Sequence, residues 1–361
     1  MMRPKEDRLS VLALTRYARN GASSRVRVLQ FIEPLRSRGV DVHAAPLLDE
    51  SYLNDLYGGR RTNYQKVVAG YVRRLLRLAE ARRFDVVWVQ KELFPFLPAL
   101  VERRLLARFV YDIDDAWHLR YAGSANRFAR ALASKVPETM RAARVVFAGN
   151  RHLQALAAAS GATDARHVPS VVPVHEYTRS DSPPSKVLRV GWVGSPSTVK
   201  YLDALRPAFE TLGRVRPLKL VVVGASFERG EHFCTEELPW SEAIEKRLAT
   251  RFDVGVMPLS DDEWTKGKCA YKAIQYMASG LPVVASNVGA NRDVIADGVS
   301  GRLVGDATEQ WTQALQELAV EETRRRFGDA GRERAERRYS VNAVVEKVAQ
   351  GLRDAADTGA A

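Results

Sequence analysis

The stretch from Lys268 to Ser286 reads KCAYKAIQYMASGLPVVAS and contains a helix, a stop and a strand in short succession. Gly280 stands where a helix C-terminal glycine belongs, and Pro282 prevents the helix from continuing. The apolar run that begins at Val283 is typical of a buried strand in a parallel sheet. The stretch therefore predicts a helix–strand unit of an α/β fold.

The predicted helix has a narrow polar stripe, and apolar side chains cover most of its remaining surface. This stripe consists of Lys268, Lys272, Gln275 and Ser279. Two lysines near the start of a helix favour an anionic ligand, because the free N–H groups and the helix dipole add positive potential there. An amphipathic helix with a solvated face explains the periodicity equally well, so the pattern alone leaves both interpretations open.

The second half of the stretch, MASGLPVVAS at residues 277–286, is followed by Gly289 and by DGVSG at residues 297–301. In this order the chain resembles the donor-site signature of the retaining glycosyltransferases of family four, the glycogen-synthase and mannosyltransferase type. The first half departs from that signature, because Gln275 and Gly267 stand at the positions of its two glutamates. A Lys-Cys-x-x-Lys-x-x-Gln-Tyr-Met-Ala variant is found instead, which we interpret as a subfamily trait.

The resemblance implies the GT-B fold, in which two facing Rossmann-like domains, each with a mostly parallel sheet, hold ligands in a cleft between them. The alternation of strand-like and helix-like segments supports this fold, since it restarts after a Pro/Ser-rich interval. We expect an acceptor-binding domain at residues 1–173, a linker at 174–187 and a donor-binding domain at 188–339. A last helix within residues 340–361 is expected to return to the first domain.

Composition predicts a cytoplasmic protein that can bury two cores in its 361 residues. No apolar run approaches the roughly 20 residues of a membrane span, and the N-terminus lacks the apolar core of a signal peptide. The two cysteines, Cys234 and Cys269, exclude a disulfide framework and a cysteine-rich metal site. The location that we expect is the cytoplasm or the inner face of the plasma membrane.

Positive charge is concentrated in the first half of the chain. Residues 1–175 contain 29 Lys and Arg against 16 Asp and Glu, whereas the rest contains 26 against 27. The segment Tyr64–Phe84 mixes arginines with valines and leucines, a composition that would attract anionic lipid headgroups. An arginine-rich face that is merely solvated stays open as well. Nucleic-acid binding is disfavoured, because no helix-turn-helix, RNA-recognition or zinc-finger pattern accompanies the charge.

Two loops that follow predicted strands are candidates for binding the donor. The first contains Gly21, which permits close backbone approach, although a plain tight turn explains it equally well. By resemblance, Gly21 would lie under the donor diphosphate or the reacting sugar, with Arg25 as a nearby cation. The second loop is GWVGSPSTVK at residues 191–200, in which relatives place an arginine and a lysine on the diphosphate. Lys200 lies near that lysine position, whereas Ser195 or Pro196 occupies the arginine position, and a solvent-facing Lys200 stays open.

The resemblance extends the donor site to further positions. It implies that Lys266, Lys268 or Lys272 supplies the missing charge on the diphosphate. Gln275 stands at the ribose-binding position and can both donate and accept a hydrogen bond. The donor site that we predict consists of Gly21, Arg25, Gly194, Ser195, Lys200, Lys268, Lys272, Gln275 and Gly289.

The acidic segment YDIDDAWH at residues 111–118 is the candidate for chemistry. Asp112, Asp114 and Asp115 resemble the D-x-D motif that holds a metal ion in glycosyltransferases of the GT-A type. We favour a metal-free interpretation, because cationic groups could neutralise the diphosphate. Asp114 and Asp115 would then bind sugar hydroxyls or act as a base toward the acceptor. By resemblance His118 would touch the transferred sugar, although a surface histidine is the commoner case.

Together these features predict a retaining glycosyltransferase that needs neither a metal nor a cofactor. It would transfer a sugar from a nucleoside diphosphate sugar to the hydroxyl group of a glycan, a lipid-linked or a small-molecule acceptor. We expect the product to belong to a cell-envelope glycan, a lipopolysaccharide or another glycoconjugate. A nucleotide-sugar 2-epimerase and a non-catalytic sugar-nucleotide-binding subunit are the alternatives, and a metal-dependent enzyme of the GT-A type is less favoured.

Overall fold

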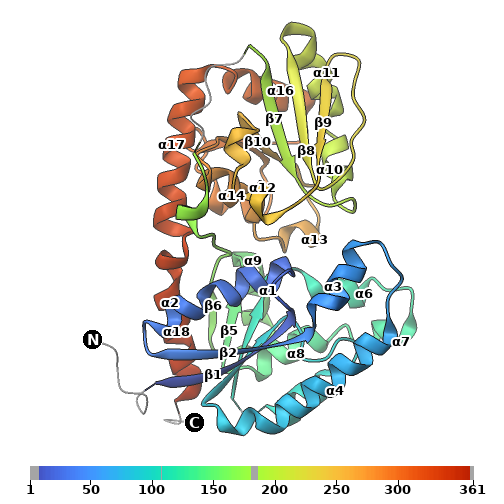
Figure 1. Ribbon diagram of the computed structural model, residues 1–361, viewed down its shortest axis with the longest axis vertical. Helices are drawn as coiled ribbons and strands as arrows, with labels where there is room; N and C mark the ends of the chain where they lie inside the picture. The colour runs from blue at the N-terminus through green and yellow to red at the C-terminus, as the bar shows by residue number, and fades with distance from the viewer. Residues whose placement is uncertain (1–7, 107, 180–185, 358–361) are drawn as a thin grey trace. The chain divides into compact units, whose positions relative to one another are not determined.

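The structure is a computed structural model that describes residues 8–106, 108–179 and 186–357. The chain forms two compact units (Figure 1). Unit 1 extends to Val171 and also includes the stretch from Val344 onward, whereas unit 2 comprises Val172–Ala343. Each unit contains a six-stranded parallel sheet. The predicted fold class, two α/β domains with parallel sheets, is therefore confirmed.

The sheet of unit 1 has the strand order β2-β1-β3-β4-β5-β6. The chain runs from β1 to β2 on one side and then crosses to β3 on the other, so its winding reverses between β1 and β3. Every residue of the three strands from β3 to β5 is buried, as expected for strands that helices cover on both faces. The strands are β1 Leu9–Tyr17, β2 Val40–Leu48, β3 Val86–Gln90, β4 Phe109–Ile113, β5 Val145–Ala148 and β6 Ala165–His167.

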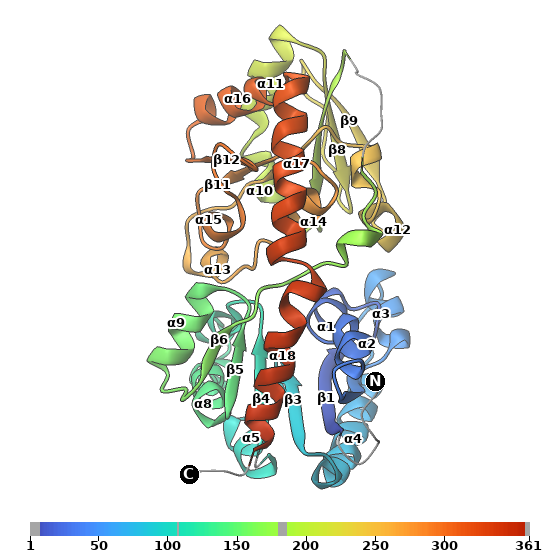
Figure 2. The same cartoon turned by 90° about the vertical axis from the view of Figure 1, so that its left-hand side faces the viewer.

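Helices from both ends of the chain cover this sheet. The last helix, α18 Val341–Ala356, lies beside it (Figure 2), and Arg166 is paired with Asp354 at 2.6 Å. Among the described helices, none has the length and the apolar character that a membrane crossing requires. The other helices are α1 Ala22–Arg27, α2 Ile32–Arg36, α3 Glu50–Tyr57, α4 Tyr64–Glu80, α5 Ala99–Leu105, α6 Trp117–Ala122, α7 Arg127–Arg130, α8 Lys135–Ala142 and α9 Arg151–Ala159.

The sheet of unit 2 has the order β12-β11-β10-β7-β8-β9, which is the strand order of a Rossmann fold. Its winding reverses between β7 and β10. Val174 and Tyr177, which fall in the expected linker, pack in the core of this unit, and residues 180–185 of that linker lie outside the described residues. The strands are β7 Leu188–Val193, β8 Leu218–Val223, β9 Cys234–Leu238, β10 Val254–Met257, β11 Val283–Ser286 and β12 Gly301–Val304.

The helix in the stretch that begins at Lys268 is shorter than its periodicity predicts. It is α14 Tyr271–Ala278, and it begins after Ala270, whose φ of 50° is left-handed and interrupts the helical backbone. Lys268 therefore lies in the turn that follows α13 Glu263–Lys266. The predicted polar stripe is wrong, because Gln275 and Ser279 are buried inside the unit. The remaining helices are α10 Val199–Asp203, α11 Arg206–Val215, α12 Glu242–Glu245, α15 Asn291–Val294, α16 Thr308–Glu317 and α17 Glu321–Arg338.

Candidate functional site

The carboxyl ends of β7, β10 and β11 bring together several predicted residues of unit 2. The loop that begins at Gly194 follows β7, the segment with Lys268 and Lys272 follows β10, and the turn at Gly289 follows β11. These strands flank the point at which the sheet reverses its winding. In open α/β sheets, ligands bind at this edge and at this point.

Lys272 is held over the face of a buried tryptophan. Its Nζ lies 4.5 Å from the centroid of the Trp192 ring, a distance that allows a cation–π interaction. Gly194 is required beneath this arrangement, since a Cβ atom there would lie 2.0 Å from a carbon of the Trp192 ring. The sequence Trp192-Val193-Gly194 thus positions the amine of Lys272 at the start of α14.

Apart from the Trp192 ring, the described residues offer the charge of the Lys272 amine little stabilisation. Helix α14 has no capping side chain and no acidic residue in its first turn. Across the part of the chain that the structure describes, no carboxylate pairs with Lys272. Burial lowers the pKa of Lys272 to about 7, and the nearby charge of Lys268 lowers this pKa further. A bound anion would relieve both effects.

The neighbouring cations differ in their surroundings. The Nζ of Lys268 lies 5.4 Å from the centroid of the Trp264 ring. Lys266 is paired with Glu263 at 2.8 Å and with Asp261 at 3.6 Å, so its charge is already compensated. Lys272, which has no described carboxylate partner, is therefore a better candidate for an anionic ligand than Lys266, and Lys268 lies close enough to lower the pKa of Lys272.

The loops that follow β10 and β11 are held together by close backbone packing at a glycine and by hydrogen bonds of short polar side chains. Gly289 adopts a left-handed φ of 50°, and a Cβ atom there would lie 3.1 Å from the Cα of Lys266. The hydroxyl of Ser286 accepts a hydrogen bond of 2.9 Å from the Leu259 N–H, which fixes the loop after β10 to the end of β11. The Asn291 amide donates to the Ser286 carbonyl at 2.9 Å. The loop backbone can thus come close to a ligand at a fixed position.

Three other predicted donor residues of unit 2 are either exposed to solvent or buried in the core. Ser195 is exposed, and its N–H donates to the Thr198 hydroxyl at 3.1 Å. Lys200 is also exposed, with its Nζ 5.2 Å from the centroid of the Tyr201 ring. Gln275 is 2% exposed, and its amide donates to the Tyr177 hydroxyl at 3.3 Å. Their contacts with a donor stay predictions, and Gln275 would have to turn its amide away from Tyr177.

In unit 1, charged side chains meet at the carboxyl ends of β1, β3 and β4. Arg16 at the end of β1 is paired with Glu92, which follows β3, at 2.8 Å. Glu92 also accepts hydrogen bonds from the Trp117 indole and, at 2.5 Å, from the Tyr121 hydroxyl. Burial opposes the ionisation of Glu92, but Lys135 and Arg16 hold the pKa of its carboxyl below the usual range.

The predicted acids lie beside this network. Lys91 adopts a left-handed φ of 67°, and its amine lies 3.3 Å from a carboxylate oxygen of Asp114. Non-glycine residues with this strain cluster at functional sites. Asp115 accepts a hydrogen bond from the Ala116 N–H at 3.0 Å, and His118 is partly buried in the first turn of α6. Within the described residues, no group of three or more His, Cys, Asp or Glu side chains could hold a metal ion.

The first predicted donor loop also lies in unit 1, before α1. A Cβ atom on Gly21 would lie 2.2 Å from the Cβ of Tyr17, so the turn requires glycine. Arg25 is buried in α1. The hydroxyl of Ser24 donates to Gln90 at 3.1 Å and accepts from the Tyr17 N–H at 3.0 Å, which fixes α1 to the ends of β1 and β3. The requirement for Gly21 is thus explained by packing alone.

Sequence reasoning missed Trp192, Lys91, Glu92 and Trp117. The pair Lys91-Glu92 directly follows the buried strand β3, as Asp114 follows β4, so strand-end position alone could have indicated both residues. Trp117 offered a weaker signal. The centroid of its ring lies 4.6 Å from the guanidinium of Arg120, which is close to it in the chain. The guanidinium of Arg16 lies 5.0 Å from the same centroid, but Arg16 is distant in the chain, so this second contact depends on the fold.

Comparison with known families gives one match in unit 2. Residues 186–321 match the family model described as "Glycosyl transferases group 1". These residues include the whole carboxyl edge with Lys268, Lys272 and Gly289. The resemblance of unit 2 to group 1 glycosyltransferases is therefore confirmed. A comparison with curated proteins finds no match.

Several solved structures are similar to this chain over nearly its full length. A sucrose-phosphate synthase from Thermosynechococcus elongatus has a TM-score of 0.69 at 16% identity, over 96% of this chain and 98% of that one. HepE from Anabaena, in complex with UDP and glucose, has a TM-score of 0.69 at 15% identity, over 96% and 99%. A glycosyltransferase from Rickettsia africae has a TM-score of 0.68 at 12% identity, over 98% and 100%. At these identities the likeness shows the two-domain α/β fold.

Proposed function

We propose that the protein is a retaining glycosyltransferase that transfers a sugar from a nucleoside diphosphate sugar to a hydroxyl acceptor. The observation that carries this proposal is the pair Lys268 and Lys272 at the carboxyl edge of a Rossmann-type sheet, within residues that match group 1 glycosyltransferases. The complexes of HepE with UDP, with UDP and glucose, and with UDP-glucose support the choice of donor. The resemblance in sequence supports retention of configuration.

In this reaction the leaving group is the nucleoside diphosphate, and negative charge grows on it as the bond to the sugar breaks. Lys272 and Lys268 would stabilise this charge, since their amines are positioned before the donor binds. Gly194 and Gly289 would let the loop backbone approach the phosphates. The exposed Lys200 would add its charge from α10, which follows the loop after β7.

Unit 1 would bind the acceptor and the transferred sugar. The carboxylates of Asp114 and Asp115 can accept hydrogen bonds from sugar hydroxyls, and a carboxylate there can accept the proton of the attacking hydroxyl. The amine of Lys91 lies 3.3 Å from a carboxylate oxygen of Asp114, which holds that side chain in place. His118 would contact the sugar. We propose an acceptor from cell-envelope glycan, lipopolysaccharide or glycoconjugate synthesis and a reaction that needs no metal.

A thermal-shift screen against UDP, GDP, ADP and dTDP is expected to identify the donor base. A ligand at 100 times its Kd adds about 2.7 kcal/mol to the free energy of unfolding, so one nucleotide should raise Tm clearly. Lys272→Ala should remove most of this shift. The result should be the same in EDTA. A screen in which no nucleotide raises Tm would contradict the proposal.

Turnover separates the competing enzyme classes. With the identified donor and an extract of envelope acceptors, the transferase is expected to release the nucleoside diphosphate in step with glycosylated product. Formation of UDP-N-acetylmannosamine from UDP-N-acetylglucosamine alone would identify an epimerase instead. Nucleotide binding without turnover on any acceptor would identify a non-catalytic binding subunit.

Donor binding is expected to take up a proton near neutral pH. Burial lowers the pKa of Lys272 to about 7, and a bound diphosphate would raise this pKa because it favours the ammonium form. Above pH 7 the amine must regain its proton to bind, so affinity should fall by up to about tenfold per pH unit. Calorimetry at pH 8 in two buffers of different ionisation enthalpy measures the uptake. Lys272→Arg, which stays charged, should lose it, and wild-type protein that takes up no proton would contradict this role.

A further inference from the structure

Helix α4 packs on unit 1 through a face that contains an arginine. Arg74 is 1% exposed and donates to the carbonyls of Thr15, at 2.5 Å, and Ala45, at 3.2 Å. A Cβ atom on Gly70 would lie 2.3 Å from the Leu47 carbonyl oxygen, so the helix lies directly against β2. The orientation of α4 about its own axis is therefore fixed.

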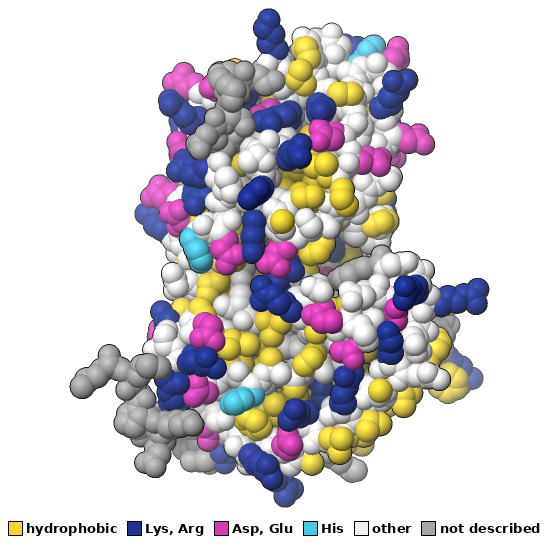
Figure 3. All heavy atoms as spheres, in the orientation of Figure 1, with side chains coloured by type: hydrophobic (Ala, Val, Ile, Leu, Met, Phe, Trp, Pro, Cys, Tyr) yellow, Lys and Arg dark blue, Asp and Glu magenta, His cyan; other side chains and the backbone are white. Residues whose placement is uncertain are grey.

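The opposite face of α4 turns its large apolar side chains toward solvent. Each of five such side chains is more than half exposed, from 51% to 78%. They are one helical stripe, since they recur at spacings of three and four residues. Figure 3 shows hydrophobic side chains gathered along the edge of the molecule where α4 lies. This surface, the α4 stripe, consists of Tyr64, Val68, Val72, Leu75 and Leu76.

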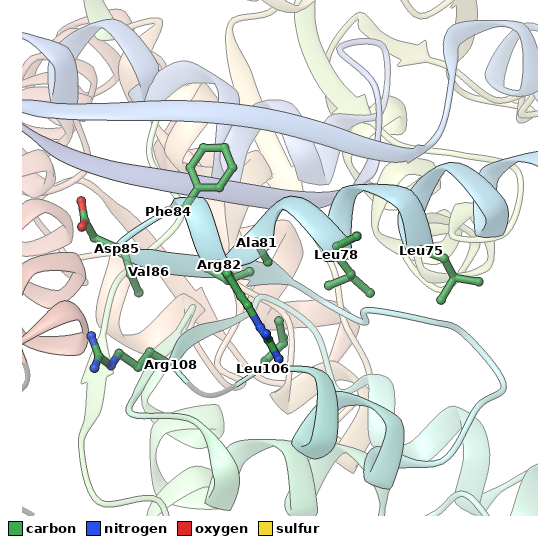
Figure 4. A pocket seen from close by; sticks show the side chains of 11 residues that line it. Leu75, Leu78, Ala81, Arg82, Phe84, Asp85, Val86, Leu106 and Arg108 are labelled. Carbon is green, nitrogen blue, oxygen red and sulfur yellow. The ribbon is translucent and has the colours of Figure 1, made fainter.

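The α4 stripe borders an open hollow of about 810 Å³. Its lining includes Leu75 and Leu78 of α4, Leu106 from the segment before β4, and the charged side chains of Arg82, Asp85 and Arg108 (Figure 4). The hollow lies at the amino ends of β3 and β4, so it is separate from the carboxyl edge that holds the predicted acids. Its lining combines apolar side chains with two arginines and one acid, Asp85, and this mixed lining fits an apolar chain that carries an anionic headgroup.

The segment around α4 carries an excess of positive charge, although Asp49, Asp55 and Glu80 pair with four of its cations. From Arg60 to Arg83 the chain contains eight Lys and Arg and a single acid, Glu80. Arg61, Arg82 and Arg83 are exposed, and within the described residues none of them has a carboxylate partner. Arginines beside an exposed apolar stripe are the pattern of a helix that lies in the interface of an anionic membrane.

We propose that the α4 stripe docks on an anionic lipid bilayer. The helix would lie in the plane of the interface, with its apolar side chains among the upper acyl chains and the flanking arginines at lipid phosphates. The hollow beside Leu75 would take part of one acyl chain. An apolar protein partner could also bind the α4 stripe, but such a partner would not explain the excess of arginine beside it. We therefore favour the anionic bilayer. The proposal is independent of the sugar-transfer reaction.

Sedimentation with lipid vesicles tests the proposal. The full chain is expected to bind vesicles of equimolar phosphatidylcholine and phosphatidylglycerol at low salt, and to bind phosphatidylcholine alone much more weakly. The double variant Val72→Glu/Leu76→Glu should lower the binding constant at least about tenfold, because it places charge at the interface. Arg82→Gln/Arg83→Gln should lower it about 30-fold on anionic vesicles only, at about fivefold per basic residue.

The matched control is Val215→Glu/Val320→Glu in unit 2, where the side chains are 69% and 56% exposed. These changes should leave vesicle binding unchanged, and all variants should melt at the wild-type temperature. Wild-type protein that ignores anionic vesicles, or equal losses in the α4 and control variants, would overturn the proposal. A dimer in light scattering that Val72→Glu/Leu76→Glu dissociates, without vesicle binding, would assign the stripe to a second copy of the chain instead.

Discussion

Replacing Lys272 by methionine is expected to weaken nucleoside diphosphate binding and to stabilise the unliganded protein. The amine is partly buried, repelled by Lys268, and unpaired with any described carboxylate, so removing its charge removes an unfavourable interaction. Methionine keeps a similar length and can still pack on the Trp192 ring. A charge-assisted contact contributes about 2 kcal/mol, which is a loss of about 30-fold in affinity. Calorimetric titration measures the affinity, and scanning calorimetry without ligand measures the rise in Tm.

The control for Lys272→Met is the same substitution at a lysine that lies far from the predicted donor site. Lys186 is exposed and precedes β7, at the opposite end of the sheet from Lys272. Lys186→Met should change neither affinity nor Tm. Unchanged affinity in Lys272→Met together with a higher Tm would make Lys272 a misplaced core lysine rather than a binding group. A lower Tm would mean that its charge supports the fold.

In Lys272→Met the affinity for the nucleotide is expected to fall while Tm rises. These opposite changes distinguish a binding residue from a residue that only supports the fold. A residue selected only for packing gains stability and function together, whereas a preorganised charge costs stability before its ligand arrives. The strained backbone at Ala270 and at Lys91 fits the same pattern. Each of these residues lies at the carboxyl edge of its own sheet, next to a predicted site residue.

The helix–strand unit after Lys268 could be predicted because its signals are local. Gly280 has a φ of 70°, and Pro282 follows it, so the end of α14 is determined by two residues close in the chain. The start of α14 could not be predicted in the same way. Ala270 is left-handed although alanine favours helix, and only the surrounding packing can impose this conformation.

The contacts that define each site depend on the strand order, which periodicity does not contain. Trp192 and Lys272 meet because β7 and β10 are neighbours across the point where the sheet reverses. In unit 1, Arg16 and Glu92 pair because β1 and β3 are adjacent. Helix α4 shows a different limit. Its apolar positions would normally face the core, but the buried Arg74 binds backbone carbonyls and turns them outward.

Replacing Asp112 by alanine is expected to destabilise unit 1 more than any surface change. Arg27 and Asp112 are each 1% exposed, and the Arg27 Nε lies 2.8 Å from a carboxylate oxygen of Asp112. Without Asp112, the guanidinium keeps its hydrogen bond of 2.7 Å to the Val168 carbonyl, but it loses this carboxylate while its charge stays buried. A buried charge that loses its partner costs about 3–5 kcal/mol. Urea unfolding measures this loss, and Glu33→Ala in the exposed pair with Arg36 should cost under about 1 kcal/mol.

Removing both partners is expected to cost far less than removing Asp112 alone. Burial raises the pKa of Asp112 to about 6, although Arg27 opposes this shift, so desolvation outweighs the attraction between the two groups. Because this pKa lies above its unfolded value, the free energy of unfolding should fall as pH rises from about 4 to 6. Arg27→Met/Asp112→Leu removes both buried charges and this slope, and should recover most of the stability that Asp112→Ala loses. If the double variant is as unstable as Asp112→Ala, the pair holds unit 1 together through its shape and hydrogen bonds rather than through balanced charge.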